Sequence, residues 1–328
     1  MLLSNTRLVI LRILKLTFKP STMKVGKVWF FLVVAVSVAT VVSSRQVDSG
    51  TGGQELDQKL SNHSDGTPGN KDQSYTPNRI RLNLNTLLQE RSQDISKKVL
   101  RPRSSRSFSK VLFENVRLSV PIRQHALQTN FIQGMAVGSL KPTQYGRYMV
   151  QDTAYLANAN KVYSEAAQKM EEQGKPDFAF FYRSQAAKYE DFYKEFLKTW
   201  ALESAEAVHE GPAVQAYMGY QQAVVKQHPR YLPVAMLPCT MLWPWMADSL
   251  IKTVDKKNPY YEDWFVKNLR APGTQSSTER FVDENVTAFD EGIALEIFCE
   301  GMMNELNFFR EACDEAPYKL SEICPSAG

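Results

Sequence analysis

Long apolar segments are scarce in this 328-residue sequence, and no run of about 20 apolar residues occurs after position 45. A polytopic membrane protein is therefore excluded, because each membrane-spanning helix needs a run of that kind. Cysteine is also rare, and four cysteines in a chain of this length exclude a small protein built on disulfides. Aromatic residues, by contrast, are plentiful, since 17 Phe, 14 Tyr and 5 Trp exclude disorder throughout the chain.

The common catalytic and nucleotide-binding motifs are absent as well. The chain contains no glycine-rich dinucleotide or P-loop motif, no H-E-x-x-H, no C-x-x-C and no G-x-S-x-G. One E-x-x-H pair is present, Glu206 with His209, whereas a di-iron bundle needs two such pairs and further carboxylates. We therefore expect no metal site, and a metal-dependent oxidase is the least favoured hypothesis.

The charges are unevenly distributed along the chain, which carries 39 basic and 35 acidic residues and a formal net charge of +4. Residues 1–44 hold six of the basic residues and no acidic one, so the remainder has 33 basic and 35 acidic residues. A net charge of −2 gives this remainder no global attraction for nucleic acid.

The N-terminal region has the pattern of a signal peptide. Residues 28–42 form an apolar stretch of 15 residues, preceded by Lys24 and Lys27 and followed by two serines. Met23 stands where such a peptide would begin. The pattern predicts targeting to the secretory pathway, with no stable membrane span after cleavage. A signal-anchored membrane protein and an organelle-targeted protein are the alternatives, and 15 residues are few for a span.

The next region, 45–106, is dominated by Gly, Ser, Asn, Asp and Gln and has no sustained apolar period. We expect a disordered linker or pro-segment here. Near its end, Arg103 and Arg106 form an R-x-x-R pattern, which fits either a secretory processing site or an exposed basic linker. The predicted organisation is a targeting segment (1–44), this linker, and one folded domain at 107–328.

From residue 108 onward the apolar residues recur with a helical period, as in Tyr148, Tyr155 and Val162. No convincing strand follows residue 108. The pattern predicts helices over 110–127, 145–170, 179–208, 214–227, 234–254, 261–269, 278–289 and 293–312. We therefore predict an all-α bundle of seven or eight helices.

Three side chains capable of chemistry lie within apolar stretches of these helices. Cys239 is either a small buried hydrophobe or a nucleophile, and a nucleophile needs a neighbour that accepts its proton. Asp152 and Glu305 lie on aromatic helix faces, with Tyr155 and Phe308 three residues further on. Such carboxyl groups are costly to bury, so we expect perturbed pKa values and a functional site. A hydrogen bond between helices is the structural alternative.

Six segments, in this order, resemble the thiaminase-II (TenA-type) family, which shares the haem-oxygenase-like helical fold with the PqqC proteins. The segments are 130–134 (NFIQG), 138–140 (GSL), 148–156 (YMVQDTAYL), 235–239 (AMLPC), 259–264 (PYYEDW) and 305–312 (ELNFFREA). The resemblance spans essentially all of 108–328. Its Q-D-x-x-Y-L and L-P-C elements are specific in combination, whereas either alone is weak.

The resemblance implies a hydrolase on a haem-oxygenase-like bundle that acts on a small molecule without a cofactor. The substrate would be thiamin or a thiamin-derived aminopyrimidine, and the product a hydroxymethylpyrimidine. Cys239 would be the nucleophile that adds to the pyrimidine ring, and Glu305 the acid/base that handles the ring-nitrogen proton. Asp152 would bond to the amino edge of the ring and fix its orientation. The resemblance also suggests a homo-oligomer.

Further residues of the pocket are implied by the same resemblance. Tyr155 would border the pocket, and Phe308 would stack on the ring. Tyr217 looks like the family's tyrosine near the cysteine, although its alignment needs a one-residue gap and Tyr220 is a rival.

Two positions of the expected substrate site depart from the family pattern. Trp243 stands four residues after Cys239, and Asn268 stands four residues after the tryptophan of the P-x-Y-x-x-W element. The family usually has tyrosine at both, so a phenolic hydroxyl is replaced by another polar group in each case. A non-catalytic protein that binds a pyrimidine or another flat ligand is therefore the alternative.

The other cysteines lie in or after the last predicted helix. Cys313 and Cys324 are near enough in sequence to form a disulfide, as a secretory compartment would allow. Cys299 and Cys313 would be about 21 Å apart on one helix, too far for a disulfide. A catalytic Cys239 must stay reduced, which conflicts with an oxidising compartment.

Overall fold

The computed structural model describes residues 107–324, and within them the chain is all-α, with 11 α-helices and no strand. The predicted targeting segment (1–44), the linker (45–106) and the possible cleavage site at Arg106 lie outside the described residues. The predicted fold class is confirmed. Among the described helices, none combines the length and the apolar character needed to cross a bilayer.

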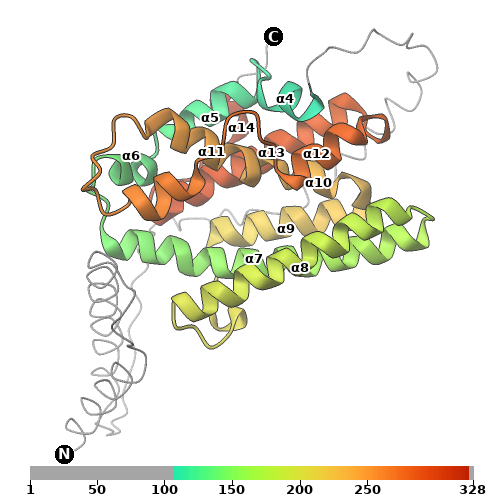
Figure 1. Cartoon of the computed structure of the whole chain (residues 1–328), viewed down its shortest axis with the longest axis horizontal. Coiled ribbons are helices and arrows are strands. Elements are labelled where there is room, and N and C mark those ends of the chain that lie inside the picture. The colour runs from blue at the N-terminus through green and yellow to red at the C-terminus, as the bar shows by residue number, and fades with distance from the viewer. Residues whose placement is uncertain (1–106, 325–328) are drawn as a thin grey trace, which may run out of the picture. The chain divides into compact units, whose positions relative to one another are not determined.

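The helices follow one another along the chain, with the longest connections on either side of η4 (Figure 1). In chain order they are α4 (Phe108–Phe113), α5 (Ser119–Leu127), α6 (Asn130–Ala136), α7 (Pro142–Glu172), α8 (Pro176–Thr199), η2 (Ala205–Ala207), α9 (Pro212–Gln227), η3 (Pro229–Tyr231), α10 (Leu232–Ala235), α11 (Leu237–Leu250), the π-helix η4 (Tyr261–Val266), α12 (Ser277–Glu284), η5 (Val286–Ala288), α13 (Glu291–Ala312) and α14 (Leu320–Ile323).

The two longest helices, α7 and α8, pack against each other as an antiparallel pair, with α9 beside α7 (Figure 1). Both helices begin at a proline, which has no N–H to leave unpaired in the first turn. The turn between them passes through Gly174, whose φ of 66° lies in the left-handed region that glycine adopts without strain.

Helix α13 is the centre of the bundle and packs against α5, α9, α10 and α11. It is buried on most sides: Phe298, Met302, Leu306 and Phe309 are all completely inaccessible to solvent. Each such side chain contributes roughly 1.5–3 kcal/mol by leaving water. At the start of the helix, the Asp290 carboxylate accepts a hydrogen bond from the Ile293 N–H at 3.0 Å. Because the middle of α13 is surrounded by apolar side chains, any polar side chain there lies in an apolar interior.

The chain has more helices than the seven or eight predicted. The short α6 and α14 lack a clear periodic signal, and two predicted helices are each divided into two α-helices. The predicted 278–289 helix is α12 followed by the 3₁₀ helix η5. The 110–127 helix is interrupted because the Asn115 side chain accepts hydrogen bonds from the N–H groups of Arg117 and Leu118, both at 3.1 Å. Tertiary packing then favours two short helices over one long one.

The predicted 234–254 helix is divided at Met236. Pro238 is the second residue of α11, and without an N–H it cannot continue the hydrogen-bond ladder from α10. The predicted 179–208 helix also stops early, at Thr199, where Ala201 adopts a left-handed φ of 52°. The predicted helix over 261–269 is the π-helix η4, a form often found at functional sites.

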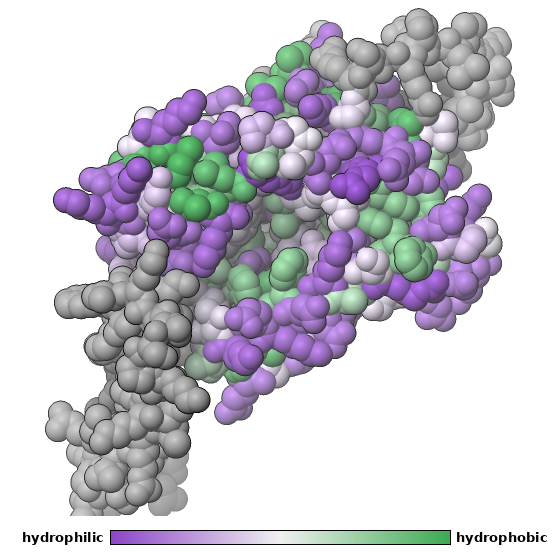
Figure 2. Space-filling view, viewed as in Figure 1, coloured by the Kyte–Doolittle hydropathy of each residue, from purple (hydrophilic) through white to green (hydrophobic). Residues whose placement is uncertain are grey.

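The face of the bundle seen in Figure 2 is mostly hydrophilic. It is hollowed near its centre, where less polar side chains lie within a rim of hydrophilic ones. The long helices α7 and α9 border this side of the molecule, with α11 and α13 across from them (Figure 1).

Candidate active site

Glu305 is a buried carboxylate on the central helix α13, with only 2% of its surface exposed. Its Oε1 accepts a hydrogen bond from the Tyr217 hydroxyl of α9 at 2.9 Å. Its Oε2 accepts one from the Trp243 indole N–H of α11 at 3.0 Å. Two donors from two other helices therefore fix both oxygens, which orients the carboxyl group before any ligand arrives.

Burial raises the pKa of Glu305 to about 7, because the ionised form loses its hydration in the interior. The hydrogen bonds from Trp243 and Tyr217 lower the pKa and offset part of this effect. The result is a carboxyl group that gives or accepts a proton near neutral pH, as a general acid/base must.

Asp152, on α7, is a second buried carboxylate and is 8% exposed. Burial and the charge of Glu305 together raise the pKa of Asp152 to about 8. Unlike Glu305, its carboxylate accepts no hydrogen bond from the side chains of residues 107–324. A largely buried carboxyl group that accepts no such bond is suited to receiving a donor from a ligand.

Cys239 lies in the first turn of α11 and is close to both carboxylates. Burial raises the pKa of its thiol well above the ordinary value, and the charges of Glu305 and Asp152 raise it further. The nearby Tyr155 hydroxyl and the Arg270 guanidinium act in the opposite direction. Without a ligand, the sulfur is therefore held as the neutral thiol.

Arg270 is placed beside this cysteine by a break in the backbone ladder of α11. Pro244 has no N–H, so the carbonyl of Thr240 lacks its usual partner within the helix. Arg270 donates a hydrogen bond to that carbonyl and pairs with the buried carboxylate of Glu279. A guanidinium is thus anchored to the residue next to Cys239.

Aromatic rings form the walls around these groups. The rings of Tyr148 and Phe308 have centroids 4.4 Å apart, and those of Tyr155 and Tyr217 are 4.7 Å apart. Tyr148 also lies 5.8 Å from the ring of Trp243. The hydroxyl group of Tyr148 is buried and has no hydrogen-bond partner within the described part of the chain, whereas the Tyr155 hydroxyl lies beside the Cys239 thiol. Such walls offer flat apolar area and an unused polar group, as a site for a planar heterocycle needs.

The structure places most of the predicted site residues together. Tyr217 is the tyrosine that reaches Glu305, whereas its rival Tyr220 donates its hydroxyl hydrogen to the carbonyl of Ile297. Asn268 is the exception, because its side chain donates to the carbonyl of Trp264, four residues earlier, at 2.8 Å. Among the described residues it makes no hydrogen bond to the two carboxylates or to the thiol.

Two residues of this site were not predicted from the sequence. Tyr148 precedes Asp152 by four residues, so helical spacing alone places both on one face. Arg270 has no such signal, because its partners Thr240 and Glu279 come from other parts of the chain. The unpaired carbonyl that it binds follows from Pro244, but the identity of the donor does not.

The other candidate features do not form a site. All four cysteines are free thiols, so the suggested Cys313–Cys324 disulfide is not formed. Cys324 instead donates to the carbonyl of Leu118. Glu206, of the single E-x-x-H pair, pairs with Lys161 at 3.6 Å on the surface. Within residues 107–324, no group of three or more His, Cys, Asp or Glu residues is arranged to hold a metal ion.

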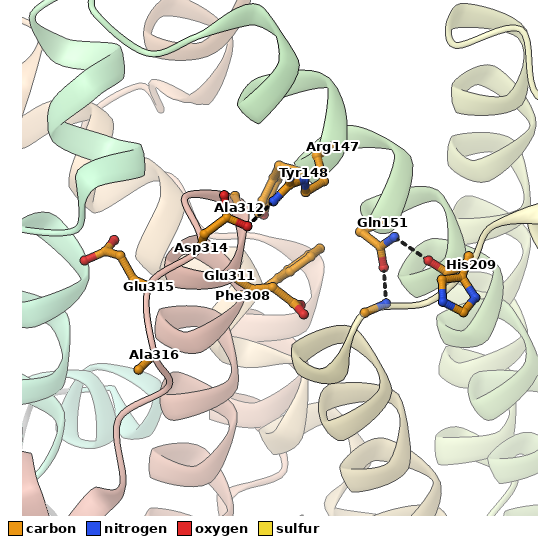
Figure 3. Close-up of a pocket in the computed structure, with 11 residues that line it drawn as sticks. Arg147, Tyr148, Gln151, His209, Phe308, Glu311, Ala312, Asp314, Glu315 and Ala316 are labelled. Atoms are coloured by element: carbon orange, nitrogen blue, oxygen red, sulfur yellow. Dashed lines mark hydrogen bonds and ion pairs between the residues drawn. The ribbon is translucent and has the colours of Figure 1, made fainter. Parts of the chain in front are cut away.

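A pocket of about 610 Å³ adjoins the buried groups and shares Tyr148 and Phe308 with them (Figure 3). Its remaining lining residues are polar or small, and they come from α7, the segment before α9, the end of α13 and the residues that follow α13: Arg147, Gln151, His209, Gly211, Glu311, Ala312, Asp314, Glu315 and Ala316. Gln151 links α7 to the segment before α9, because its side-chain amide donates a hydrogen bond to the His209 carbonyl and accepts one from the Gly211 N–H, both at 2.8 Å.

Comparison with solved structures identifies the fold. A TenA homologue from P. horikoshii OT3 has a TM-score of 0.50 and 19% sequence identity, over 63% of this chain and 98% of that one. A TenA homologue from Pyrococcus furiosus has a TM-score of 0.47 and 17% identity, over 62% of this chain and 99% of that one. Among curated proteins, none matches the sequence. The TENA/THI-4/PQQC family profile matches residues 120–315, which include every residue of the buried site, and the chain belongs to this family.

Proposed function

We propose that this protein is a thiaminase-II-like hydrolase that converts thiamin or a thiamin-derived aminopyrimidine to a hydroxymethylpyrimidine. One observation carries the proposal: two buried carboxyl groups and a thiol, from three different helices, meet between aromatic rings. Residues that serve only stability seldom combine an unpaired buried carboxylate with a second one whose pKa is near neutral. Family membership supports the same class of activity.

In the proposed reaction, Glu305 and Cys239 act together on the pyrimidine ring. A neutral pyrimidine is a poor electrophile, and protonation of a ring nitrogen makes attack on carbon feasible. Glu305 gives its proton to the nitrogen while the sulfur of Cys239 bonds to a ring carbon. The proton lost by the thiol replaces the one that Glu305 gave up, so the addition is balanced.

The raised pKa of the thiol fits this sequence of events. Two carboxylates disfavour a thiolate while the site is empty. A protonated ring brings a positive charge between them and the sulfur, which favours the thiolate only when substrate is bound. The open acceptor on Asp152 is placed to receive the amino edge of the ring.

The second half of the reaction exchanges the substituent on the exocyclic methylene. Addition of sulfur pushes electrons toward that carbon, so its bond to the substituent breaks and the electron pair leaves with the substituent. Water then adds to the methylene group, the bond to sulfur breaks, and the thiol of Cys239 is restored. The leaving group is a thiazole in the case of thiamin and an amine in the case of its degraded forms.

The direct test uses the purified full chain with thiamin and, separately, with 4-amino-5-aminomethyl-2-methylpyrimidine. Formation of hydroxymethylpyrimidine is followed by mass spectrometry, with Cys239→Ser measured beside the wild type. We expect product from the wild type and a loss of at least about 10³-fold in the variant. No product from either compound with folded wild-type protein would overturn the proposal.

A non-catalytic binding protein is the second candidate, and the position of Asn268 favours it. Its side chain bonds within its own helix, so a polar group expected at the substrate is engaged elsewhere. A binding protein would hold thiamin or a pyrimidine equally well with and without the Cys239 thiol, and would release no product. Calorimetric titration of the wild type and Cys239→Ser therefore separates the two functions.

Location and assembly remain predictions from the sequence. We propose that residues 28–42 direct the chain to the secretory pathway, and that the domain forms a homo-oligomer. Retention of a tagged full chain in the cytosol would contradict the first prediction, and a monomeric mass in solution would contradict the second.

A further inference from the structure

The pocket beside the buried site has a different character from the site itself. Tyr148 and Phe308 belong to both, so the pocket begins where the aromatic walls end (Figure 3). Tyr148 is 1% exposed, and its hydroxyl has no hydrogen-bond partner among the described residues. A cavity of about 610 Å³ that is lined by the same two aromatic residues has room for a second half of a ligand.

The far wall of the pocket is the C-terminal cap of α13. The Asp314 N–H donates to the Glu311 carbonyl and the Glu315 N–H to the Arg310 carbonyl, both at 3.0 Å. Asp314 adopts a left-handed φ of 58°, as the residue after a helix often does. This cap places Asp314 and Glu315 on the lining, at the helix end that carries partial negative charge. The Glu315 carboxylate points away from the other lining residues (Figure 3) and accepts a hydrogen bond from the Asn130 N–H at 3.1 Å.

Negative charge exceeds positive charge on the lining. Glu311, Asp314 and Glu315 contribute three carboxylates, and Arg147 is the single guanidinium among the lining residues. Arg147 is already paired with Asp314 at 2.5 Å. Arg310, which lies outside the lining, offsets Glu315 at 3.3 Å. The carboxylate of Glu311 accepts a hydrogen bond from the Ala213 N–H at 3.0 Å. A phosphate group in this pocket would therefore meet three carboxylates and no unpaired guanidinium among the lining residues.

We infer that this pocket receives the leaving-group half of the substrate and selects a neutral or cationic group over a phosphorylated one. The inference rests on the proposed hydrolase and adds the substrate class to it. Thiamin carries a cationic thiazolium with a neutral hydroxyethyl arm, whereas thiamin monophosphate carries the same ring with an anionic arm. Both compounds have the same pyrimidine and the same bond to be broken. A difference in their hydrolysis would therefore come from contacts between the pocket and the arm of the thiazolium ring.

The test compares kcat/KM for thiamin and thiamin monophosphate with the full chain. We expect the wild type to prefer thiamin by at least about tenfold. Asp314→Asn removes a carboxylate and releases Arg147, so the preference is expected to fall by about fivefold or more. Asparagine tolerates the left-handed conformation of this position, so the helix cap is retained. Glu315→Gln is expected to lower the preference in the same direction.

Glu195→Gln is the matched control, because Glu195 is an exposed carboxylate on α8 that does not line the pocket. Its ratio of kcat/KM values should equal that of the wild type. A wild type that prefers the phosphorylated compound would overturn the inference. So would a preference that Asp314→Asn and Glu315→Gln both leave unchanged.

Hydrolysis of 4-amino-5-aminomethyl-2-methylpyrimidine tests the proposed function independently of the inference about the pocket. Its leaving group is ammonia, which is too small to contact the pocket, so its hydrolysis reports on the buried site alone. If no compound is hydrolysed, calorimetric affinities for thiamin and thiamin monophosphate take the place of kcat/KM. Equal affinities in the wild type would then overturn the inference, and tighter binding of thiamin that weakens in Asp314→Asn would support it.

Discussion

The buried site and the adjoining pocket contain the same type of side chain in two different environments. Glu305 and Asp152 lie in the interior, where burial raises the pKa of each to about 7 and about 8. Asp314 and Glu315 follow the end of α13, where each is paired with an arginine, and the side chain of Asp314 is 75% exposed whereas that of Glu315 is 18% exposed. The comparison shows that burial turns a carboxyl group into a proton carrier, whereas pairing near water leaves it as a charge that attracts or repels a ligand.

Substitution of a buried carboxylate should affect catalysis far more than substitution of a carboxylate in the adjoining pocket, and this is the largest effect that we expect. Glu305→Gln keeps the shape of the side chain and its hydrogen bond from Trp243 but cannot transfer a proton. We expect kcat for the aminomethyl pyrimidine to fall by about 10²–10⁴-fold. Glu315→Gln, measured in the same assay, is the outer counterpart and should change kcat by less than about threefold. Equal losses in the two variants would show that the buried carboxylate has no special role.

The free energy of unfolding should depend on pH through the buried carboxyl group of Asp152 and not through an exposed one. In the folded chain Asp152 has a pKa of about 8, well above the value of about 3.9 for an exposed aspartate. Between these values the folded state binds the additional proton, so the wild-type free energy of unfolding falls as pH rises. Asp152→Asn removes that fall, so relative to the wild type we expect its free energy of unfolding to gain roughly 4 kcal/mol between about pH 5 and about pH 9.

Urea unfolding of both proteins at the two pH values measures this difference. Asp314→Asn is the control, since its carboxylate is exposed and the change should stay within about 0.5 kcal/mol at either pH. If Asp152→Asn shifted stability equally at both pH values, the carboxyl group of Asp152 would be ionised throughout, contrary to its expected pKa.

A smaller effect is expected at the thiol when its nearest cation is removed. Arg270→Met takes away the guanidinium that lowers the pKa of Cys239. We expect alkylation of Cys239 by iodoacetamide at about pH 8, followed on its own peptide, to slow by roughly 3–10-fold. Arg183→Met removes a surface arginine paired with Glu171 and should leave the rate unchanged. Faster alkylation in Arg270→Met would contradict this expectation. It would mean that a looser α11 exposes the thiol more than the lost positive charge lowers its reactivity.

The smallest expected change in stability is at the unpaired hydroxyl of the shared wall. Tyr148→Phe removes a buried hydroxyl that has no partner within residues 107–324, so the free energy of unfolding should not fall and should rise by up to about 1 kcal/mol. Tyr217→Phe removes one that is bonded to Glu305 and should cost about 1 kcal/mol. Equal costs for the two variants would indicate that Tyr148 has a partner in solution.

The sequence predicted the helices that carry the two buried carboxylates more accurately than the helix that carries Cys239. The predicted 145–170 and 293–312 lie within α7 (Pro142–Glu172) and α13 (Glu291–Ala312), because long apolar periods survive packing. The breaks at Asn115 and Met236 were missed, since a side-chain acceptor and a proline act through hydrogen bonds that periodicity does not report.

Within the site, too, some residues could be predicted from the sequence and others depend on packing. Asp152 and Glu305 could be selected because charge on an apolar helix face is visible in the sequence. The choice between Tyr217 and Tyr220 could not be made, since both are buried on α9 and only the packing of α13 decides which one meets Glu305. Arg270 depends on contacts with Thr240 and Glu279, which no local pattern contains.

Titration of the Glu305 carboxyl group tests the central claim most directly. Infrared difference spectra between the wild type and Glu305→Gln, recorded across a pH series, isolate the C=O stretch of the protonated group. We expect a protonated-carboxyl band that is present in acid, disappears with a midpoint near pH 7, and is absent from the variant. A band that disappears near the ordinary glutamate value of about 4.3 would contradict the assignment of Glu305 as the acid/base.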